Sequence, residues 1–334
     1  MSTAMHCDPT TRHDFVYLFD VSDGNPNGDP DAGNLPRVDP ETMQGLVTDV
    51  AIKRKVRDWV NLMRGAESRY KIYVENSGVA LNTKHQYAYD ALDIKSTGTK
   101  QKRTEVDTAR TWMREQFYDV RTFGAVMTTG VNCGQVRGPL QLTFARSIDQ
   151  IVPLDLSITR VAITDPKDAE VVEKDDGTGK GGKVTEMGRK ALVPYALYRG
   201  YGFFTPHFAK GDATGNPPDP RLGQGGAFTE QDLALFWDAL QQMWDADHSA
   251  SRGMLALRGL YIFSHENPRG NAPAHRLFER VQVARRPAVQ APRAFTDYVV
   301  TIDDDSTLPP GVTLKRLVDD SRVPSAASAS QRAF

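Results

Sequence analysis

Apolar residues recur along this chain in short runs separated by turn-forming residues, a pattern typical of a mixed α and β protein. The run Phe15–Phe19 is aromatic and β-branched, which predicts a buried strand. Further strands are expected at 70–74, 142–146, 154–163, 254–263 and 295–302. Residues 274–283 predict a further short helix or strand.

Helical periodicity is strongest in three segments. Asp39-Pro40-Glu41 offers an N-cap, a proline at the first helical position and an acid in the first turn, so we expect the first long helix to begin there. Its buried face is predicted from a spacing of 100° per residue as Ile52, Val56, Trp59 and Met63. A second helix is expected over 105–119, buried through Val106, Ala109, Met113 and Phe117. A third follows the cap Thr229, with apolar residues Leu233, Phe236, Trp237, Leu240 and Trp244.

Two polar segments interrupt this pattern. Residues 76–104 predict an exposed insertion whose cations either contact nucleic acid or keep the loop soluble. Residues 163–192 are charged and glycine-rich and predict a protruding hairpin. Residues 303–334 are rich in Asp, Pro, Ser and Ala, so we expect a flexible tail after one domain spanning 1–302.

Composition narrows the class of protein. The chain has 334 residues, a net charge of −1 and two cysteines without a CxxC motif, which favours a reducing cytoplasm over a secreted disulfide framework. The amino terminus does not resemble a signal peptide, and no apolar run approaches the about 18 residues of a membrane helix. We therefore expect a cytoplasmic protein without a membrane partner.

Against this neutral background, the first long helix is locally basic. Residues 51–64 hold five cations and one acid, a net of +4. Lys53, Arg57 and Arg64 form a stripe beside the apolar face, which fits either a solvated surface or a contact with a polyanion. The preceding loop contains Asn25, Asn27 and Gly28.

A second stretch, residues 120–146, has glycines at 124, 130, 134 and 138 within a strand-like sequence. Two interpretations remain open: a hairpin with bulges, or a loop whose backbone amides contact phosphates, with side-chain contacts from Gln135, Arg137 and Gln141.

Two catalytic motifs are incomplete. Gly177–Lys183 matches part of a phosphate-binding loop, but Val184 stands where Ser or Thr would hold magnesium. His265-Glu266 is not completed to HExxH because Arg269 replaces the second histidine. A metal-dependent endoribonuclease remains the alternative function, since Asp20, Asp23, Asp29 and Asp31 cluster near the first loop.

Four segments in order resemble the family that supplies the backbone subunit of type I-C CRISPR Cascade, the Cas seven branch of the repeat-associated RNA-binding superfamily. They are Phe19 through Asn25–Pro30 to Lys53-Arg54, then 117–126, 187–195 and 270–275. The resemblance implies an α+β fold: a ferredoxin-like, RRM-like palm with a finger near 76–104 and a thumb near 163–192. It also implies a non-catalytic protein without cofactor or metal.

The implied partners are a crRNA, the target DNA strand through the RNA hybrid, further copies of the chain arranged head-to-tail as a helical filament, and other Cascade subunits. The predicted RNA contacts are Asn25, Asn27, Gly28, Lys53, Arg54, Arg57, Gln135, Arg137, Gln141, Arg189 and Lys190.

One further pattern is Arg199-Gly200-Tyr201-Gly202-Phe203, within a segment that agrees with the RNA-recognition-motif consensus at five of seven specified positions. Aromatic residues on such a strand can stack on bases. We nevertheless expect Tyr201 and Phe203 to be core or subunit contacts, because the resemblance places RNA on the helix, loops and thumb.

Overall fold

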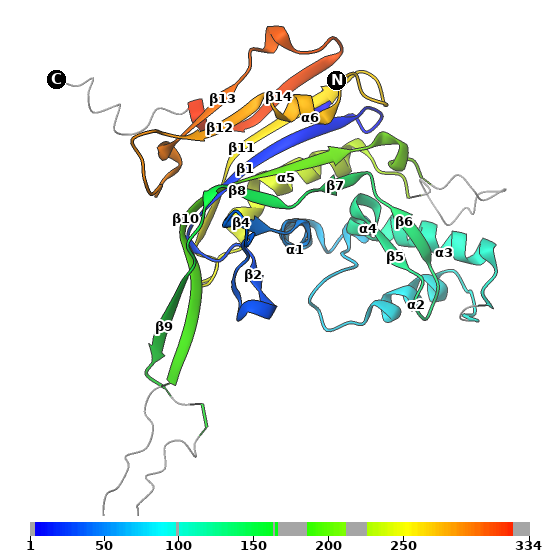
Figure 1. Cartoon of the computed structure of the whole chain (residues 1–334). Helices are drawn as coiled ribbons and strands as arrows, with labels where there is room; N and C mark the ends of the chain where they lie inside the picture. Colours follow the sequence, from blue (N-terminus) through cyan, green and yellow to red (C-terminus); the bar gives the residue numbers. More distant parts are fainter. Residues whose placement is uncertain (1–3, 98–99, 163, 166–185, 212–225, 323–334) are drawn as a thin grey trace, which may run out of the picture.

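A computed structural model describes residues 4–97, 100–162, 164–165, 186–211 and 226–322. An eight-stranded sheet forms its centre, with the strand order β14-β11-β1-β10-β8-β4 and with β7 and β9 also pairing with β10 (Figure 1). Every strand pair in it is antiparallel. The prediction of a mixed α and β fold is confirmed at this level.

The sheet is built from strands of very different lengths. Its members are β1 (His13–Gly24), β4 (Gln44–Val47), β7 (Leu140–Leu142), β8 (Ala145–Gln150), β9 (Leu154–Arg160), β10 (Glu186–Phe204), β11 (Met254–His265) and β14 (Val312–Asp319). Strand β1 is buried along almost its whole length because β10 and β11 flank it on both sides. Residues 15–19 therefore form the predicted buried strand.

Helices α1 (Asp49–Arg64) and α5 (Glu230–Ala246) cover one face of the sheet, which we call the inner face. Helix α5 begins with the predicted cap: Thr229 accepts from the amide of Asp232, and Asp232 accepts from that of Thr229. All five apolar residues predicted for α5 are buried.

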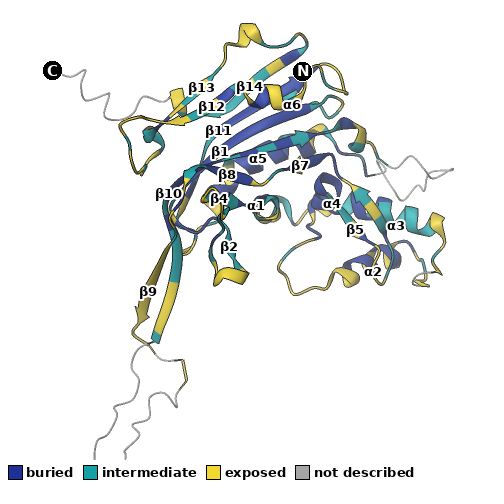
Figure 2. Ribbon diagram, viewed as in Figure 1, coloured by how far each residue is buried: buried dark blue, intermediate teal, exposed yellow. Residues whose placement is uncertain are grey.

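A smaller layer covers part of the opposite, outer face. It consists of α6 (Ala274–Phe278) and the two-stranded sheet of β12 (Val281–Arg285) and β13 (Tyr298–Ile302). Segment 274–283 thus contains both a helix and the start of a strand. In Figure 2 the central strands are mostly buried between the two layers.

A third cluster contains α2 (Leu81–Ala91), α3 (Arg103–Gln116), α4 (Tyr118–Phe123) and the hairpin of β5 (Gly124–Met127) and β6 (Gly134–Arg137). Segment 76–104 is therefore not simply an exposed insertion. Helix α2 buries Lys84 and His85, because Lys84 donates to the carbonyls of residues 72 and 73 and His85 meets the Tyr73 hydroxyl at 2.7 Å.

Four further expectations about elements are wrong. Helix α1 begins after Thr48 rather than at Asp39, and Met63 is 55% exposed rather than part of its buried face. Residues 70–74 form no strand, since Lys71 makes only an isolated bridge with Phe117. The expected tail is not flexible from residue 303 onward, because β14 pairs with β11.

Strand β9 and residues 186–192 of β10 form an antiparallel ribbon that projects away from the body (Figure 1). We call this segment the β9–β10 ribbon. Every residue of β9 is exposed, including Leu154, Leu156 and Ile158. The ribbon is consistent with the base of the predicted thumb, whereas most of 163–185, including the incomplete phosphate-binding loop, lies outside the described residues.

Candidate nucleic-acid interface

The first predicted loop is tied to the beginning of α1. Asn27 accepts through Oδ1 from both the amide and the hydroxyl of Thr48, each at 2.9 Å, and Thr48 in turn accepts from the amide of Ala51. Asn25 is buried and donates to the carbonyl of Asn34 at 2.7 Å. These asparagine side chains shape the loop, and they place it beside the positive end of the helix dipole.

Gly28 allows the close approach of Asn34. A Cβ atom at this position would lie 1.9 Å from Oδ1 of Asn34, so a side chain would displace the Asn34 side chain. The loop is therefore determined by Asn25, Asn27 and Gly28 together.

The structure brings two predicted contact regions to one place. Lys53 of α1 donates to Oε1 of Gln141 at 3.3 Å, and Gln141 donates to the carbonyls of Phe123 and Gly138. Lys53 and Arg57 both lie over the Phe123 ring, at 5.5 and 5.3 Å from its centre. Residues 88 positions apart thus meet on one surface, which we call the α1 surface.

Acids from other elements balance the local excess of positive charge. Arg57 donates to Asp119 at 2.8 Å, and that carboxylate also accepts from the amides of Tyr73 and Val74. The remaining pairs of this segment are Lys53–Asp49, Arg54–Asp58, Lys55–Asp247 and Arg64–Glu67. The count of +4 therefore overestimates the free charge, because Asp49, Asp119, Asp247 and Glu67 lie outside residues 51–64.

These cations differ in their availability to a ligand. Arg54 is 59% exposed and lies 3.6 Å from Asp58, so its pair is weak. Lys55 is buried, and burial lowers its pKa even though Asp247 opposes that effect. Lys55 consequently connects α1 to the C-terminal end of α5. Arg54 is exposed to solvent, and Lys53 lies on the α1 surface next to Gln141.

The glycine-rich stretch forms the hairpin β5–β6, as one of the two interpretations predicted. Gly124 adopts a φ of 85°, and a Cβ there would lie 2.5 Å from the carbonyl oxygen of Val136. Gln135 and Arg137 are exposed on β6, and the Arg137 guanidinium stacks 4.2 Å above the Phe208 ring. Gln141 belongs to the α1 surface, whereas Gln135 and Arg137 lie on the hairpin beside it.

Arg189 and Lys190 lie on the β9–β10 ribbon. Arg189 is 80% exposed and reaches Asp155 only at 3.6 Å. Lys190 pairs across the ribbon with Leu156 and is half-buried. The structure therefore leaves the Arg189 guanidinium open to solvent, on a ribbon that projects away from the body (Figure 1).

The four aspartates of the nuclease alternative do not share one site. Asp20 is buried and accepts from the Tyr195 hydroxyl at 2.9 Å and from Arg258 at 2.8 Å. Burial raises the pKa of Asp20 against the opposing effect of Arg258. Asp29 accepts from the amide of Asp31. Among the residues that the structure describes, no group of three or more His, Cys, Asp or Glu side chains is arranged to hold a metal ion.

Sequence patterns did not identify three residues that organise the α1 surface. Thr48 is the real cap of α1, Phe123 lies beneath Lys53 and Arg57, and Asp119 anchors Arg57. No local sequence pattern indicates that Asn27 accepts a hydrogen bond from a capping threonine 21 positions away. Asp119 and Phe123 stand in a segment used for the family resemblance, which was the one available indication.

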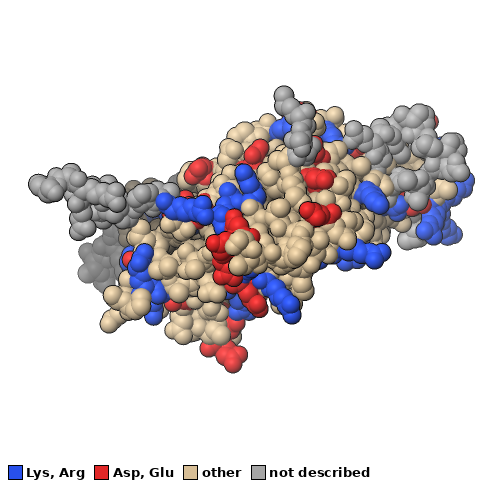
Figure 3. Space-filling view, turned by 90° about the horizontal axis from the view of Figure 1, so that it is seen from above, with Lys and Arg blue, Asp and Glu red and all other residues tan. Residues whose placement is uncertain are grey.

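Basic and acidic side chains are interspersed on the face seen in Figure 3, so no single sign of charge covers that face.

No helix among the described residues is long and apolar enough to cross a membrane.

These features describe an α and β protein with a surface of carboxylate-paired cations, backed by the Phe123 ring, at the start of a sheet-packed helix. The sequence profile of the family described as CRISPR-associated protein Cas7 matches residues 11–303. The chain therefore belongs to the Cas7 family.

One curated relative is the CRISPR-associated protein Cas7 of Haloferax volcanii, which is 31% identical over 124 residues. That alignment covers 35% of this chain and 32% of the relative, so it spans about a third of the relative's length.

Solved structures with a similar chain include a CRISPR RNA-guided surveillance complex in a pre-nicking state, with 15% identity, a TM-score of 0.43 and 76% and 78% of the two chains covered. Another CRISPR RNA-guided surveillance complex has 14% identity, a TM-score of 0.40 and coverage of 86% and 78%.

Proposed function

We propose that this chain is the backbone subunit of a type I-C CRISPR RNA-guided complex. Each copy binds the crRNA through its phosphates, without reading its sequence, so that base pairing identifies the target DNA strand. The observation that carries the proposal is the family match across residues 11–303. The assignment to type I-C rests on the four sequence segments alone.

The α1 surface supplies the main phosphate contact in this proposal. Arg54 is held by the exposed carboxylate of Asp58, in a pair that is worth about 0–1 kcal/mol when solvated, so a phosphate can replace Asp58 as its partner. The Lys53 side chain is only 12% exposed and keeps its contacts with Asp49 and Gln141, so it attracts the phosphate from beside them. Arg57 contributes its field from a fixed position, because its pair with Asp119 is almost fully buried.

The remaining predicted contacts extend the RNA path. Gln135, Arg137 and Gln141 contact the strand beside α1, and Asn25, Asn27 and Gly28 hold the loop that flanks it. Arg189 and Lys190 act where the β9–β10 ribbon leaves the body. Repeated binding of one subunit along one strand requires a head-to-tail interface that does not close, and therefore a helical filament. Other Cascade subunits complete the complex in the cytoplasm.

The first experiment is purification of the protein from cells that carry its CRISPR array. We expect a small RNA of defined length to co-purify, and we expect less RNA with the Lys53→Gln/Arg54→Gln variant. Arg322→Gln is the matched control, since Arg322 is 65% exposed on the far edge of the sheet. Purified protein without any RNA of defined length would contradict the proposal.

The second experiment separates binding from cleavage. Purified protein incubated with magnesium and RNA is expected to leave the RNA intact. Cleavage that is abolished by Asp20→Ala or Asp23→Ala would instead establish the nuclease alternative.

A further inference from the structure

The strand that carries the motif Arg199–Phe203 has different residues on its two faces. On the inner face, Gly200 and Gly202 leave room for Tyr17 and Phe15, because a Cβ at these glycines would lie 2.2 Å from the Tyr17 ring and 2.0 Å from the Phe15 ring. Arg199, Tyr201 and Phe203 alternate with these glycines, so they point to the outer face. The outer face is the one opposite α1 and α5.

Helix α6 covers only part of this face. Phe278 stacks on Tyr201 with ring centres 4.6 Å apart and contacts Phe203 at 5.6 Å. Those contacts hold both rings, partly buried, against the core of the outer face, in agreement with the expectation that they are core or subunit contacts. Beside them, however, the Phe144 ring is 53% exposed.

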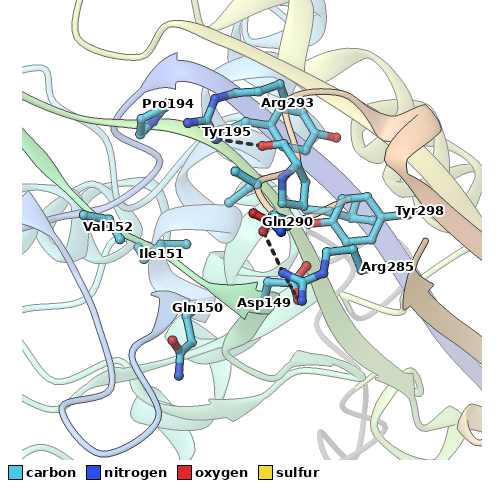
Figure 4. Close-up of a pocket in the computed structure, with 14 residues that line it drawn as sticks. Asp149, Gln150, Ile151, Val152, Pro194, Tyr195, Arg285, Gln290, Arg293 and Tyr298 are labelled. Atoms are coloured by element: carbon cyan, nitrogen blue, oxygen red, sulfur yellow. Dashed lines mark hydrogen bonds and ion pairs between the residues drawn. The ribbon is translucent and has the colours of Figure 1, made fainter. Parts of the chain in front are cut away.

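Two pockets follow one another along β8, β10 and β12 on the outer face. The first has a volume of about 570 Å³ and includes Phe144, Arg146, Arg199 and Tyr201. The second has a volume of about 430 Å³ and includes Asp149, Tyr195, Arg285, Arg293 and Tyr298, several of which are shown in Figure 4. We call the two pockets together the outer groove.

Basic residues outnumber acids in the outer groove. Its lining comprises four arginines and one acid, Asp149, and the partner Asp39 outside the lining lowers the net charge from +3 to +2. Asp149 lies 3.7 Å from Arg285 (Figure 4), and Arg146 pairs with Asp39 outside the lining. Within the described part of the chain, Arg199 and Arg293 form no ion pair, and their guanidinium groups donate to the backbone carbonyls of Val281 and Pro292.

This arrangement suits one chemical class of ligand. Arginines without an ion-pair partner attract phosphates, and the exposed Phe144 ring in the pocket that contains Arg199 offers a surface on which a base can stack. The pocket volumes are in the range of small-molecule sites, large enough for a nucleobase and its sugar. From the charge and the exposed ring we infer that the outer groove binds a segment of single-stranded nucleic acid. One base of the segment stacks on Phe144, and phosphates of the same segment contact Arg199 and Arg293.

Helix α1 packs on the inner face and the outer groove lies on the opposite face, and the two surfaces approach each other at β7, where Gln141 pairs with Phe203. The inference therefore goes beyond the proposed function, and its test must localise the bound strand. A single-stranded oligonucleotide of about twelve residues, carrying photoreactive 4-thiopyrimidines, is cross-linked to the full chain and the cross-linked peptides are identified by mass spectrometry. RNA and DNA versions distinguish the two sources of such a strand.

We expect cross-links in peptides that contain Phe144 and Tyr201, and we expect them to persist in the Lys53→Gln/Arg54→Gln variant. In that same background, Phe144→Ala should weaken binding by at least about fivefold, the lower end of the effect of losing one base–aromatic stack. Its ring is exposed, so the substitution leaves the core intact. Arg199→Gln should reduce the salt dependence of binding by about 0.7 log units, whereas the control Lys315→Gln on the exposed edge of β14 should not.

Two results would overturn the inference. One is a cross-link map without any peptide from the outer groove, together with unchanged affinity in Phe144→Ala. The other is a change in sedimentation of Phe144→Ala at unchanged affinity, which would identify the groove as a contact with a second copy of the chain.

Discussion

Helix α1 and the β9–β10 ribbon carry cations in opposite settings. Helix α1 buries five residues against the sheet and α5, and each of its cations is paired with a carboxylate. The ribbon exposes every residue of β9, and the pair Arg189–Asp155 is long and solvated. The α1 surface thus presents cations in fixed positions, whereas the ribbon presents adaptable ones.

The difference matters because a fixed cation loses little side-chain entropy when a phosphate arrives, but its existing partner must be displaced. The exposed cation Arg189 has only a solvated partner to lose, and its side chain must be ordered instead. The two regions should therefore respond differently to substitution: those that anchor α1 should affect folding, and those on the ribbon should affect only binding.

The largest effect is expected behind the α1 surface. Asp232 of α5 is fully buried and pairs with the fully buried Arg121 of α4 at 2.8 Å. Asp232→Ala leaves a buried charge without its partner, so we expect a loss of about 3–5 kcal/mol in the free energy of unfolding, measured with urea. Asp155→Ala on the ribbon is the control and should change it by less than about 0.5 kcal/mol. Similar effects for the two substitutions would refute the contrast.

A smaller effect is expected for the acid that holds Arg57. Asp119→Asn removes the charge that Arg57 pairs with but keeps one carbonyl oxygen for the backbone amides. We expect a loss of about 1–3 kcal/mol in the free energy of unfolding. Asp58→Asn is the matched control on α1, because that carboxylate is 60% exposed, and its stability should equal that of the parent.

The salt dependence of RNA binding compares the two regions directly. Lys53→Gln/Arg54→Gln on α1 and Arg189→Gln/Lys190→Gln on the ribbon should each flatten the plot of log K against log salt by about 0.7 per lost phosphate contact. Arg322→Gln should leave the slope unchanged. A slope that changes with only one of the two double variants would confine the phosphate contacts to that region.

The smallest effect is expected for the apolar side chains of the ribbon. Ile158 is 42% exposed, so Ile158→Ser should change the free energy of unfolding by less than about 0.5 kcal/mol. Ile52→Ser on α1 removes a fully buried side chain and should cost more than about 2 kcal/mol. Equal values, again from urea titrations, would show that the ribbon packs against the body in solution.

Elements with local signals could be predicted from the sequence. Helix α5 has a capping box and helical apolar spacing, and strands β1 and β11 have long apolar runs, so their positions follow from the chain alone. The cations of the candidate site on α1 also form a basic stripe that is visible in the sequence. What the sequence could not indicate was the set of carboxylates that balances this stripe, because Asp119 and Asp247 approach α1 only after folding.

Three errors have a similar cause. Asp39 resembles a helix cap, but its carboxylate instead accepts from amides of a local turn, and Thr48 caps α1 with support from Asn27. Helix α2 was missed because Lys84 becomes buried by donating to distant carbonyls. Strand β14 was missed because its mixed polar sequence suits the edge of a sheet and carries no apolar run. In each case a tertiary contact overrides the local pattern.

Strand β10 leads from the projecting ribbon into the middle of the sheet as one unbroken backbone of 19 residues. Eleven register pairs with β1 hold residues 193–204 of β10 in the sheet. A force on residues 186–192 can therefore bend this segment, but it cannot shift the strand along its own axis. The position of residues 186–192 relative to the central sheet is therefore set by the same strand that crosses the core.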